Sequence, residues 1–192
     1  MIKAVIFDLN GIFIQSDLLS DRIEKDFGIP ADKFISVLKE VKPRLREPEA
    51  PAAFSLFRPR LKAIGLGLSE KEFLDYWFSG EHVDQNMIEL AKNLREKQIK
   101  VFLLSNNFRE RAEFYRQNFP EIFANSDGTY FSWETGFTKP DPRAWQNILS
   151  EHNLRPEECV FIDDKQENLD TAKNLGLTTC HDIAELKALL NA

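Results

Sequence analysis

Four short polar clusters combine groups that could take part in catalysis, and each follows an apolar stretch or a turn. The clusters are Asp8-Leu9-Asn10-Gly11, Ser105-Asn106-Asn107, Thr138-Lys139-Pro140-Asp141 and Asp163-Asp164-Lys165. Taken singly, each has an ordinary structural interpretation. Asn-Gly is typical of a hairpin turn, Ser-Asn-Asn of a helix N-cap, and the charged clusters of exposed loops. Their chemistry therefore depends on whether the fold brings them together.

Three of these residues, Asp8, Asp163 and Asp164, are carboxylates that would repel one another if they met without a cation. Oxygen ligands of this kind favour Mg²⁺. Lys139 and the hydroxyl of Ser105 would add a charge clamp and a hydrogen-bond donor beside a carboxylate nucleophile. This set of groups suits phosphoryl transfer through an aspartyl-phosphate. The sequence has neither of the glycine-rich motifs that bind dinucleotides or nucleoside triphosphates.

The elements that must position these clusters alternate along the chain. Short apolar runs predict strands at 4–7, 101–104, 160–162 and 178–180. Helical periodicity predicts helices at 86–97, 109–118, 143–151, 167–175 and 183–190. This alternation indicates an α/β fold, with a Rossmann-like parallel sheet sandwiched by helices. In such a sheet ligands bind outside the carboxyl ends of the strands, which is where the polar clusters fall.

Residues 16–83 interrupt the alternation with four helical segments punctuated by prolines. We expect a small helical cap, inserted after the first strand and lying over the carboxyl edge of the sheet. The α/β core would then comprise residues 1–15 and 84–192.

Charged and aromatic residues outside the four clusters are mostly interpreted as structural. Five cations of the cap could reach a substrate, although a solvated helix face accounts for most of them: Lys42, Arg44, Arg46, Arg58 and Arg60. Residues 109–119 are interpreted as an ordinary amphipathic helix. Phe13, just past the first cluster, is a better candidate for touching a substrate than the three tryptophans.

Composition limits the possible partners and compartment. The 192 residues include 25 Lys and Arg against 31 Asp and Glu, a formal net charge of −6, which argues against a nucleic-acid partner. Apolar stretches are too short for a membrane span or a signal peptide. Cys159 and Cys180 stand in apolar runs and are interpreted as reduced core thiols. We expect a cytoplasmic protein without membrane partners, as a monomer or weak homodimer.

The order and spacing of the clusters resemble the motifs of the haloacid dehalogenase-like (HAD) superfamily of hydrolases. The stretches Leu-Leu-Ser-Asn-Asn, Gly-Phe-Thr-Lys-Pro-Asp-Pro and Phe-Ile-Asp-Asp-Lys-Gln-Glu-Asn carry the resemblance together with Asp8. They look most like the branch that holds α-D-glucose-1-phosphate phosphatase and the phosphatase domain of soluble epoxide hydrolase. The resemblance implies that Asp8 is the nucleophile and a metal ligand, and that Gly11 makes the bend after it.

The same resemblance implies the roles of the remaining clusters. Ser105 and the backbone at Asn106 would bind the phosphoryl oxygens of the substrate. Lys139 would bridge the phosphoryl group and the nucleophile. Asp164 would ligate Mg²⁺ directly, and Asp163 would act on the metal or on one of its waters.

Asn10 departs from the family pattern, because phosphatases of the family have a second aspartate there that protonates the leaving oxygen. Asn10 can offer its backbone carbonyl to the metal and its amide as a donor, but it cannot transfer a proton at neutral pH. We therefore expect a Mg²⁺-dependent phosphohydrolase that acts on a small phosphorylated metabolite such as a sugar phosphate.

Asn10 is also compatible with a catalytically weak phospho-ligand binder, with a hydrolytic 2-haloacid dehalogenase, or with an introduced Asp-to-Asn change. The pair Asp163-Asp164 argues against the dehalogenase, whose chemistry needs no Mg²⁺.

Overall fold

The central sheet has five parallel strands in the computed structural model, which describes residues 1–191. In the order β5-β4-β1-β6-β7 they are Gly128–Phe131, Lys100–Ser105, Ala4–Phe7, Cys159–Ile162 and Thr178–Cys180. Strand β1 is central and fully buried, with Phe7 opposite Leu103 of β4 and Ile162 of β6. The predicted Rossmann-like sheet is confirmed. Strand β5, which pairs with β4 at one edge, is absent from the prediction.

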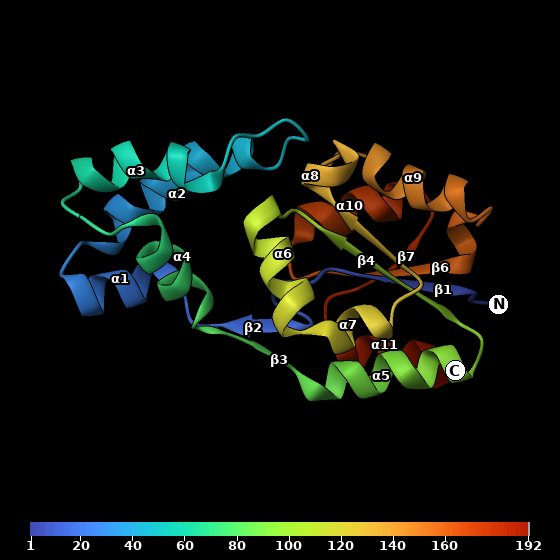
Figure 1. Cartoon of the computed structure of the whole chain (residues 1–192). Coiled ribbons are helices and arrows are strands. Elements are labelled where there is room, and N and C mark those ends of the chain that lie inside the picture. The colour runs from blue at the N-terminus through green and yellow to red at the C-terminus, as the bar shows by residue number, and fades with distance from the viewer. Residues whose placement is uncertain (192) are drawn as a thin grey trace.

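Helices cover both faces of this sheet (Figure 1). One face carries α5 (Gln85–Glu96), α6 (Arg109–Asn118), α7 (Pro120–Ala124) and α11 (Ile183–Asn191). The other carries α9 (Arg143–Glu151) and α10 (Gln166–Asn174), with the short helices α8 (Ser132–Thr135) and η1 (Pro156–Glu158) in the connections. Alternate residues of β1 serve the two faces, because successive side chains of a strand point in opposite directions. Val5 and Phe7 join the first cluster, and Ala4 and Ile6 join the second.

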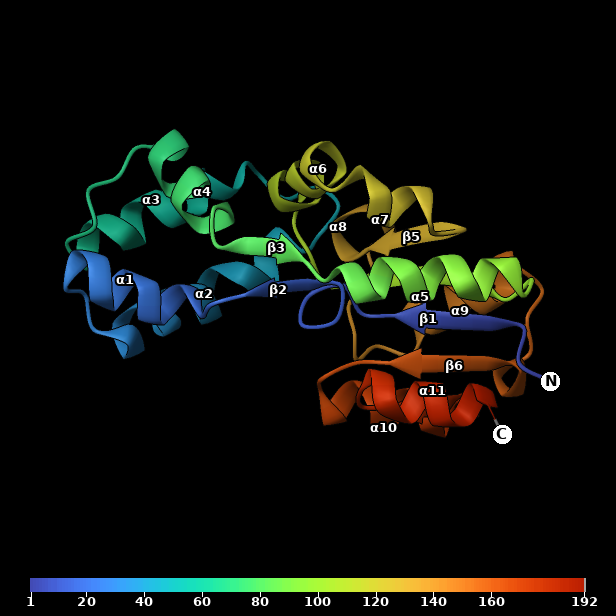
Figure 2. The ribbon, with the colours of Figure 1, turned by 90° about the horizontal axis from the view of Figure 1, so that it is seen from below.

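The inserted segment forms a separate helical layer joined to the core by a two-stranded antiparallel ribbon. The ribbon consists of β2 (Ile14–Ser16) and β3 (Glu81–Val83), which run side by side in Figure 2. Between them lie four helices: α1 (Leu19–Phe27), α2 (Ala31–Leu45), α3 (Ala53–Ala63) and α4 (Glu70–Phe78). They bury their own cluster, in which Phe73 contacts Phe34 and Phe57. All the helices of the predicted cap segment are thus found between the two ribbon strands.

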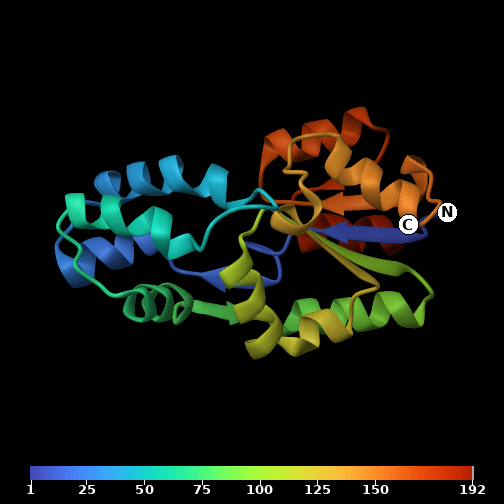
Figure 3. The same ribbon diagram turned by 45° about the horizontal axis from the view of Figure 1, so that its top comes forward.

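The cap also touches the core beyond the ribbon. Phe108, which precedes α6, packs against Trp77 of α4 with ring centroids 5.3 Å apart. The loop between α2 and α3 runs back to the core in Figure 3, and the backbone N–H of Ala53 donates to Glu110 Oε1 at 2.6 Å. Because the arrowheads of β1 and β6 point toward the cap in Figure 2, these contacts hold it beside the carboxyl ends of the strands.

Both cysteines lie in the core of the protein. Cys159 and Cys180 are free and buried, as predicted for core thiols. Among residues 1–191, the helices all lack the length or the apolar character that crossing a membrane requires.

Candidate active site

Lys139 lies between two buried carboxylates at the carboxyl edge of the sheet. Asp8 follows β1 and Asp163 follows the neighbouring strand β6, so the sheet register places them side by side. The ammonium nitrogen of Lys139 is 2.9 Å from Asp8 Oδ1 and 2.6 Å from Asp163 Oδ2. The three residues are 5%, 5% and 0% exposed in the order Asp8, Lys139 and Asp163. One cation is therefore shared by two carboxylates and reduces the repulsion between them, which is strong in this low-dielectric setting.

The two oxygens of the Asp8 carboxylate are not equivalent. Oδ1 accepts a hydrogen bond from the backbone N–H of Leu9 at 2.8 Å and forms an ion pair with Lys139 at 2.9 Å. Oδ2 has no hydrogen-bond donor among residues 1–191, and Asp8 lines a cavity. Burial raises the pKa of Asp8, although Lys139 opposes that rise. One oxygen is thus fixed, and the other is available to a ligand or a substrate.

Asp163 is fully engaged by its neighbours. Its Oδ2 accepts from Lys139 and from Asn168 Nδ2 at 2.9 Å, and its Oδ1 accepts from the backbone N–H of Lys165 at 2.9 Å. Asn168 belongs to α10 and was not among the predicted site residues. The adjacent Asp164 is exposed. Asp163 therefore orients Lys139, whereas the carboxylate of Asp164 is accessible to a cation.

The three carboxylates form a set that suits a divalent cation. Asp8, Asp163 and Asp164 can each offer one oxygen within 4.8 Å of the others. Gly11 leaves the space that Asp164 occupies: its φ is +90°, and a Cβ there would lie 3.1 Å from Asp164 Oδ2. Burial and the charge of Asp8 raise the pKa of Asp164, as expected for a crowded acidic cluster. Hard oxygen donors and surplus negative charge fit the Mg²⁺ expected from the sequence.

Asn10 contacts the core helix α6. Its Nδ2 donates to the hydroxyl oxygen of Tyr115 at 2.6 Å, and Ser105 Oγ lies 3.5 Å from its Oδ1. Burial raises the pKa of Tyr115, and Glu81 adds to the rise, so the phenol keeps its proton. The structure thus brings the predicted residues Asn10 and Ser105 together. The side-chain amide of Asn10 is bound to the Tyr115 hydroxyl, which is uncharged.

Asn106 makes contacts that the sequence does not reveal. The sequence predicts that the backbone at Asn106 binds phosphoryl oxygens. In the structure, the side chain of Asn106 binds the loop that carries Lys139. Asn106 Nδ2 donates to the carbonyl oxygen of Lys139 at 2.7 Å, and the N–H of Lys139 donates to Asn106 Oδ1 at 2.8 Å. These two bonds tie the end of β4 to the lysine that bridges the carboxylates.

A cavity of about 290 Å³ opens over these groups. Its lining combines polar residues from the strand ends with cationic residues from the cap and from α6. Among them are Asp8, Asn10, Gly11, Ser105, Asn106, Lys139, Asp164, Lys165, Lys42, Arg46 and Arg111. The cavity therefore lies between the predicted catalytic edge and the cap.

The structure corrects three interpretations made from the sequence. Lys42 and Arg46 line the cavity instead of a solvated helix face, and Arg111 shows that 109–119 is more than an ordinary amphipathic helix. Phe13 is fully buried and packs edge-to-face against Phe7, so it does not face a substrate. The solvated-face interpretation is confirmed for Arg44 and Arg58, which are exposed, whereas Arg60 is half-buried and pairs with Glu40.

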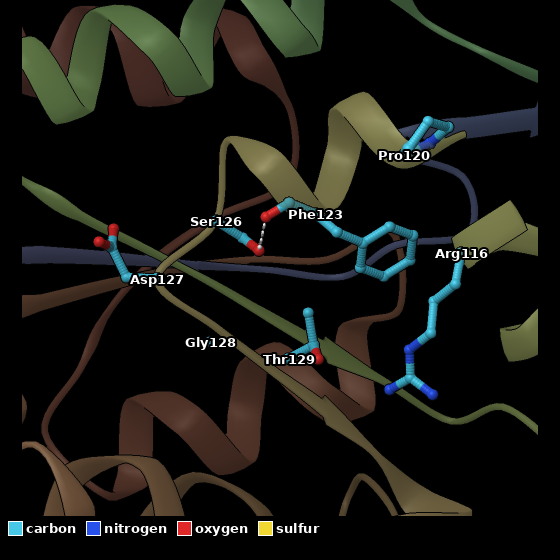
Figure 4. A pocket seen from close by; sticks show the side chains of 7 residues that line it. All are labelled: Arg116, Pro120, Phe123, Ser126, Asp127, Gly128 and Thr129. Carbon is cyan, nitrogen blue, oxygen red and sulfur yellow. Dashed lines mark hydrogen bonds between the residues drawn. The ribbon is translucent and has the colours of Figure 1, made fainter. Parts of the chain in front are cut away.

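A second pocket, of about 370 Å³, lies far from this chemistry beside α7 and β5 (Figure 4). Its charged residues are used in the fold: Arg116 pairs with Glu134 at 2.7 Å, and Asp127 accepts from the N–H of Val101 at 2.9 Å. Ser126 Oγ donates to the carbonyl oxygen of Phe123, as the dashed line in Figure 4 marks. The smaller cavity beneath the cap is therefore the candidate active site.

Comparisons with known proteins give the chain a clear set of relatives. A family model described as haloacid dehalogenase-like hydrolase matches residues 2–176. D-ribitol-5-phosphate phosphatase of Bacteroides thetaiotaomicron is 27% identical over 198 residues, which cover 93% of this chain and 91% of that protein. Rat bifunctional epoxide hydrolase 2 is 23% identical over 203 residues, covering 93% of this chain. The chain spans only 36% of the length of that larger protein.

A solved structure agrees with the fold. A HAD family enzyme from Bacteroides thetaiotaomicron, in complex with magnesium and inorganic phosphate, superimposes with a TM-score of 0.77 at 26% identity. The match covers 97% of this chain and 99% of that one.

Proposed function

Since the chain belongs to the haloacid dehalogenase-like hydrolase family, we propose that it is a Mg²⁺-dependent phosphatase of small phosphorylated metabolites that forms an aspartyl-phosphate on Asp8. The observation that carries the proposal is the arrangement of Asp8, Lys139 and Asp163. It fixes one oxygen of a buried carboxylate that lines a cavity and leaves the other oxygen without a donor among residues 1–191. The named activity of D-ribitol-5-phosphate phosphatase supports a sugar or sugar-alcohol phosphate as substrate.

In the first half-reaction, Asp8 Oδ2 forms a bond to phosphorus while the bond from phosphorus to the leaving oxygen breaks. The electron pair of that bond goes to the leaving oxygen. Lys139 reduces the negative charge on Asp8 that would otherwise oppose the approach of an anionic phosphate. Ser105, which lines the cavity at the end of β4, would donate to a phosphoryl oxygen.

In the second half-reaction, water forms a bond to phosphorus and the bond from phosphorus to Asp8 breaks, which returns the carboxylate and inorganic phosphate. Asp8, Asp164 and the backbone carbonyl of Asn10 would hold Mg²⁺, with Asp163 beside them. A bound Mg²⁺ supplies charge stabilisation for the phosphoryl oxygens. Lys139 and Asn168 hold Asp163 in place throughout.

Asn10 determines which substrates should react well. General acid catalysis contributes about 10² to 10⁴ in rate, and an amide cannot supply it. Leaving groups that depart without a proton, such as phenols, should therefore be cleaved faster than alcohols. A weak phospho-ligand binder is the second candidate, favoured by this same residue. The dehalogenase ranks third, because the acidic cluster of Asp8, Asp163 and Asp164 suits a divalent cation.

The proposal is tested by phosphate release from p-nitrophenyl phosphate and a panel of sugar phosphates, with Mg²⁺ and with a chelator. We expect release that requires Mg²⁺ and is lost in Asp8→Asn, which keeps the shape of the side chain. Phosphate-ester binding without release from any substrate would favour the binder instead.

A further inference from the structure

Lys42 and Arg46 are cations that form no ion pair with any carboxylate among residues 1–191. Lys42 lies on α2 and Arg46 caps its C-terminus, and both are half-buried in the cavity wall. Neither forms an ion pair within residues 1–191. By contrast, Arg111 pairs with Glu81, and Lys139 pairs with Asp8 and Asp163. The two cap cations therefore lack a carboxylate in direct contact, although the charge of Asp8 favours the charged form of Arg46 and that of Glu81 the charged form of Lys42.

Partial burial of an unpaired cation is unfavourable, so these two side chains carry a free-energy cost in the free protein. The ammonium group of Lys42 is 5.6 Å from the ring centre of Trp77, a weak compensation. Burial, reinforced by Arg111 and Arg46, lowers the pKa of Lys42 to about 7. An anion bound beside Lys42 would relieve this cost.

The location of Lys42 indicates which part of a substrate it would meet. Lys42 and Arg111 line the active-site cavity and also an adjoining pocket of about 260 Å³ under the cap. Asp8, Ser105 and Lys139 line only the first. Lys42 thus lies on the cap side of the cavity, away from the nucleophile. A phosphoryl group at Asp8 would direct its leaving group toward this side.

We propose that the substrate carries a second anionic group, either a carboxylate or a second phosphoryl group, on its leaving-group portion, and that Lys42 and Arg46 bind it. This inference rests on the proposed function and specifies its substrate class. The alternative is simple electrostatic attraction of any phosphate. General attraction would raise activity on every anionic ester and would weaken steeply with salt. A binding site instead distinguishes two substrates with the same phosphate.

Matched substrate pairs separate a second-anion site from general attraction. In each pair the phosphate ester is the same and only the distal group changes from alcohol to carboxylate. The pairs are glycerol 3-phosphate with 3-phosphoglycerate and sorbitol 6-phosphate with 6-phosphogluconate. Fructose 6-phosphate with fructose 1,6-bisphosphate tests a second phosphoryl group in the same way. We expect kcat/KM for at least one anionic member to exceed that of its partner by about tenfold or more, mainly through KM.

The variants Lys42→Met and Arg46→Met remove each charge while keeping an apolar stem. Each should abolish the preference, because it should lower kcat/KM for the anionic member of a pair much more than for the neutral member. Lys39→Met and Arg44→Met are matched controls, because both residues are exposed on α2 and line neither pocket. These controls should keep the preference. Equal kcat/KM within all pairs, or a preference that survives in both cavity variants, would overturn the inference while leaving the phosphatase intact.

Calorimetric binding of the same pairs to Asp8→Asn in the presence of Mg²⁺ gives a readout that does not require turnover. Tighter binding of an anionic member that is lost in Asp8→Asn/Lys42→Met supports the second-anion site, even if hydrolysis is never observed. Equal affinities for the members of every pair overturn it, whatever the outcome of the phosphatase assays.

Discussion

The side-chain amide nitrogen of Asn10 donates a hydrogen bond to the hydroxyl oxygen of Tyr115, at 2.6 Å. This contact joins the loop after β1 to α6 and holds the amide close to Asp8, the proposed nucleophile. Tyr115 is fully buried, and its burial keeps the phenol protonated. The position that would supply a proton in the family's phosphatases is therefore occupied by a well-held but non-ionisable group.

Replacing Asn10 by Asp should supply the missing proton donor. The hydroxyl of Tyr115 can donate to the new carboxylate, so the side chain keeps its place. We expect kcat/KM for alkyl phosphates such as sorbitol 6-phosphate to rise by about 10² or more. The value for p-nitrophenyl phosphate should change little, because its leaving group needs no proton. The measurement is the ratio of kcat/KM for the alkyl phosphate to kcat/KM for p-nitrophenyl phosphate. This ratio is compared between Asn10→Asp and the unchanged protein. An equal change for both esters would contradict this role.

Lys139→Met should destabilise the protein as well as inactivate it. Asp8 and Asp163 would lose their shared cation inside the protein, which costs about 3 to 5 kcal/mol in the free energy of unfolding. Burial raises the pKa of Asp8, so without Lys139 this carboxylate binds a proton more readily when folded than when unfolded. The loss should therefore be largest at neutral pH and shrink as pH falls.

Urea denaturation at about pH 7 and about pH 5 measures this difference. Lys173→Met on α10 is the control, because Lys173 is exposed and its replacement should change stability by less than about 0.5 kcal/mol. A Lys139→Met protein as stable as the control at both pH values would show that the carboxylates do not need the lysine.

Gly11→Ala and Gly65→Ala form a matched pair for the metal site. The two glycines have φ values of +90° and +88°, so each substitution strains the backbone by about 1 to 2 kcal/mol. Only the Cβ at position 11 meets a neighbour, Asp164 Oδ2 at 3.1 Å, whereas position 65 is open. We expect the Mg²⁺ concentration for half-maximal activity to rise about tenfold or more in Gly11→Ala alone. The same Mg²⁺ dependence in both variants would mean that Asp164 does not bind the cation.

Lys42 predicts a pH dependence of stability. Its pKa is lowered from 10.5 to about 7 by burial and by Arg111, Arg46 and Lys165, while Glu81 opposes the shift. Between these values the unfolded chain binds more protons at this position than the folded one. Stability relative to Lys42→Met should therefore increase with pH in that window, by at most about 1.4 kcal/mol per pH unit.

Urea denaturation of the unchanged protein and of Lys42→Met at about pH 6.5 and about pH 9 checks this slope. Lys39→Met, whose side chain is exposed on the same helix, should differ from the unchanged protein equally at both pH values. A difference between the unchanged protein and Lys42→Met that does not vary with pH would contradict the lowered pKa.

Much of the fold and of the acidic edge could be predicted because both follow from local patterns. The apolar runs that end at Asp8 and Asp163 form neighbouring parallel strands, and residues at the ends of such strands necessarily meet. Strand β5 was missed because Gly128-Thr-Tyr-Phe is short, lies at the sheet edge and lacks a continuous apolar run. Its position depends on pairing with β4, and the residues of the strand itself do not indicate that pairing.

The cationic residues that line the cavity and the bonds of Asn106 to Lys139 could not be predicted from the sequence, for a different reason. Periodicity shows that a helix has a polar face, but it does not show whether that face meets water or another layer of the protein. The helical pattern therefore does not reveal that Lys42 of α2 and Arg111 of α6 line one cavity. The bonds between Asn106 and the backbone of Lys139 depend on the path of a loop, which the spacing of residues does not determine.

Acid quenching of a single turnover, followed by mass spectrometry of the peptide that contains Asp8, tests the central claim most directly. With Mg²⁺ and p-nitrophenyl phosphate, this peptide should carry one phosphoryl group that hydroxylamine removes, as an acyl phosphate requires. Asp8→Asn should carry none. Turnover of the ester with no phosphoryl group on Asp8 at any quench time, or a label that persists in Asp8→Asn, would contradict the aspartyl-phosphate mechanism.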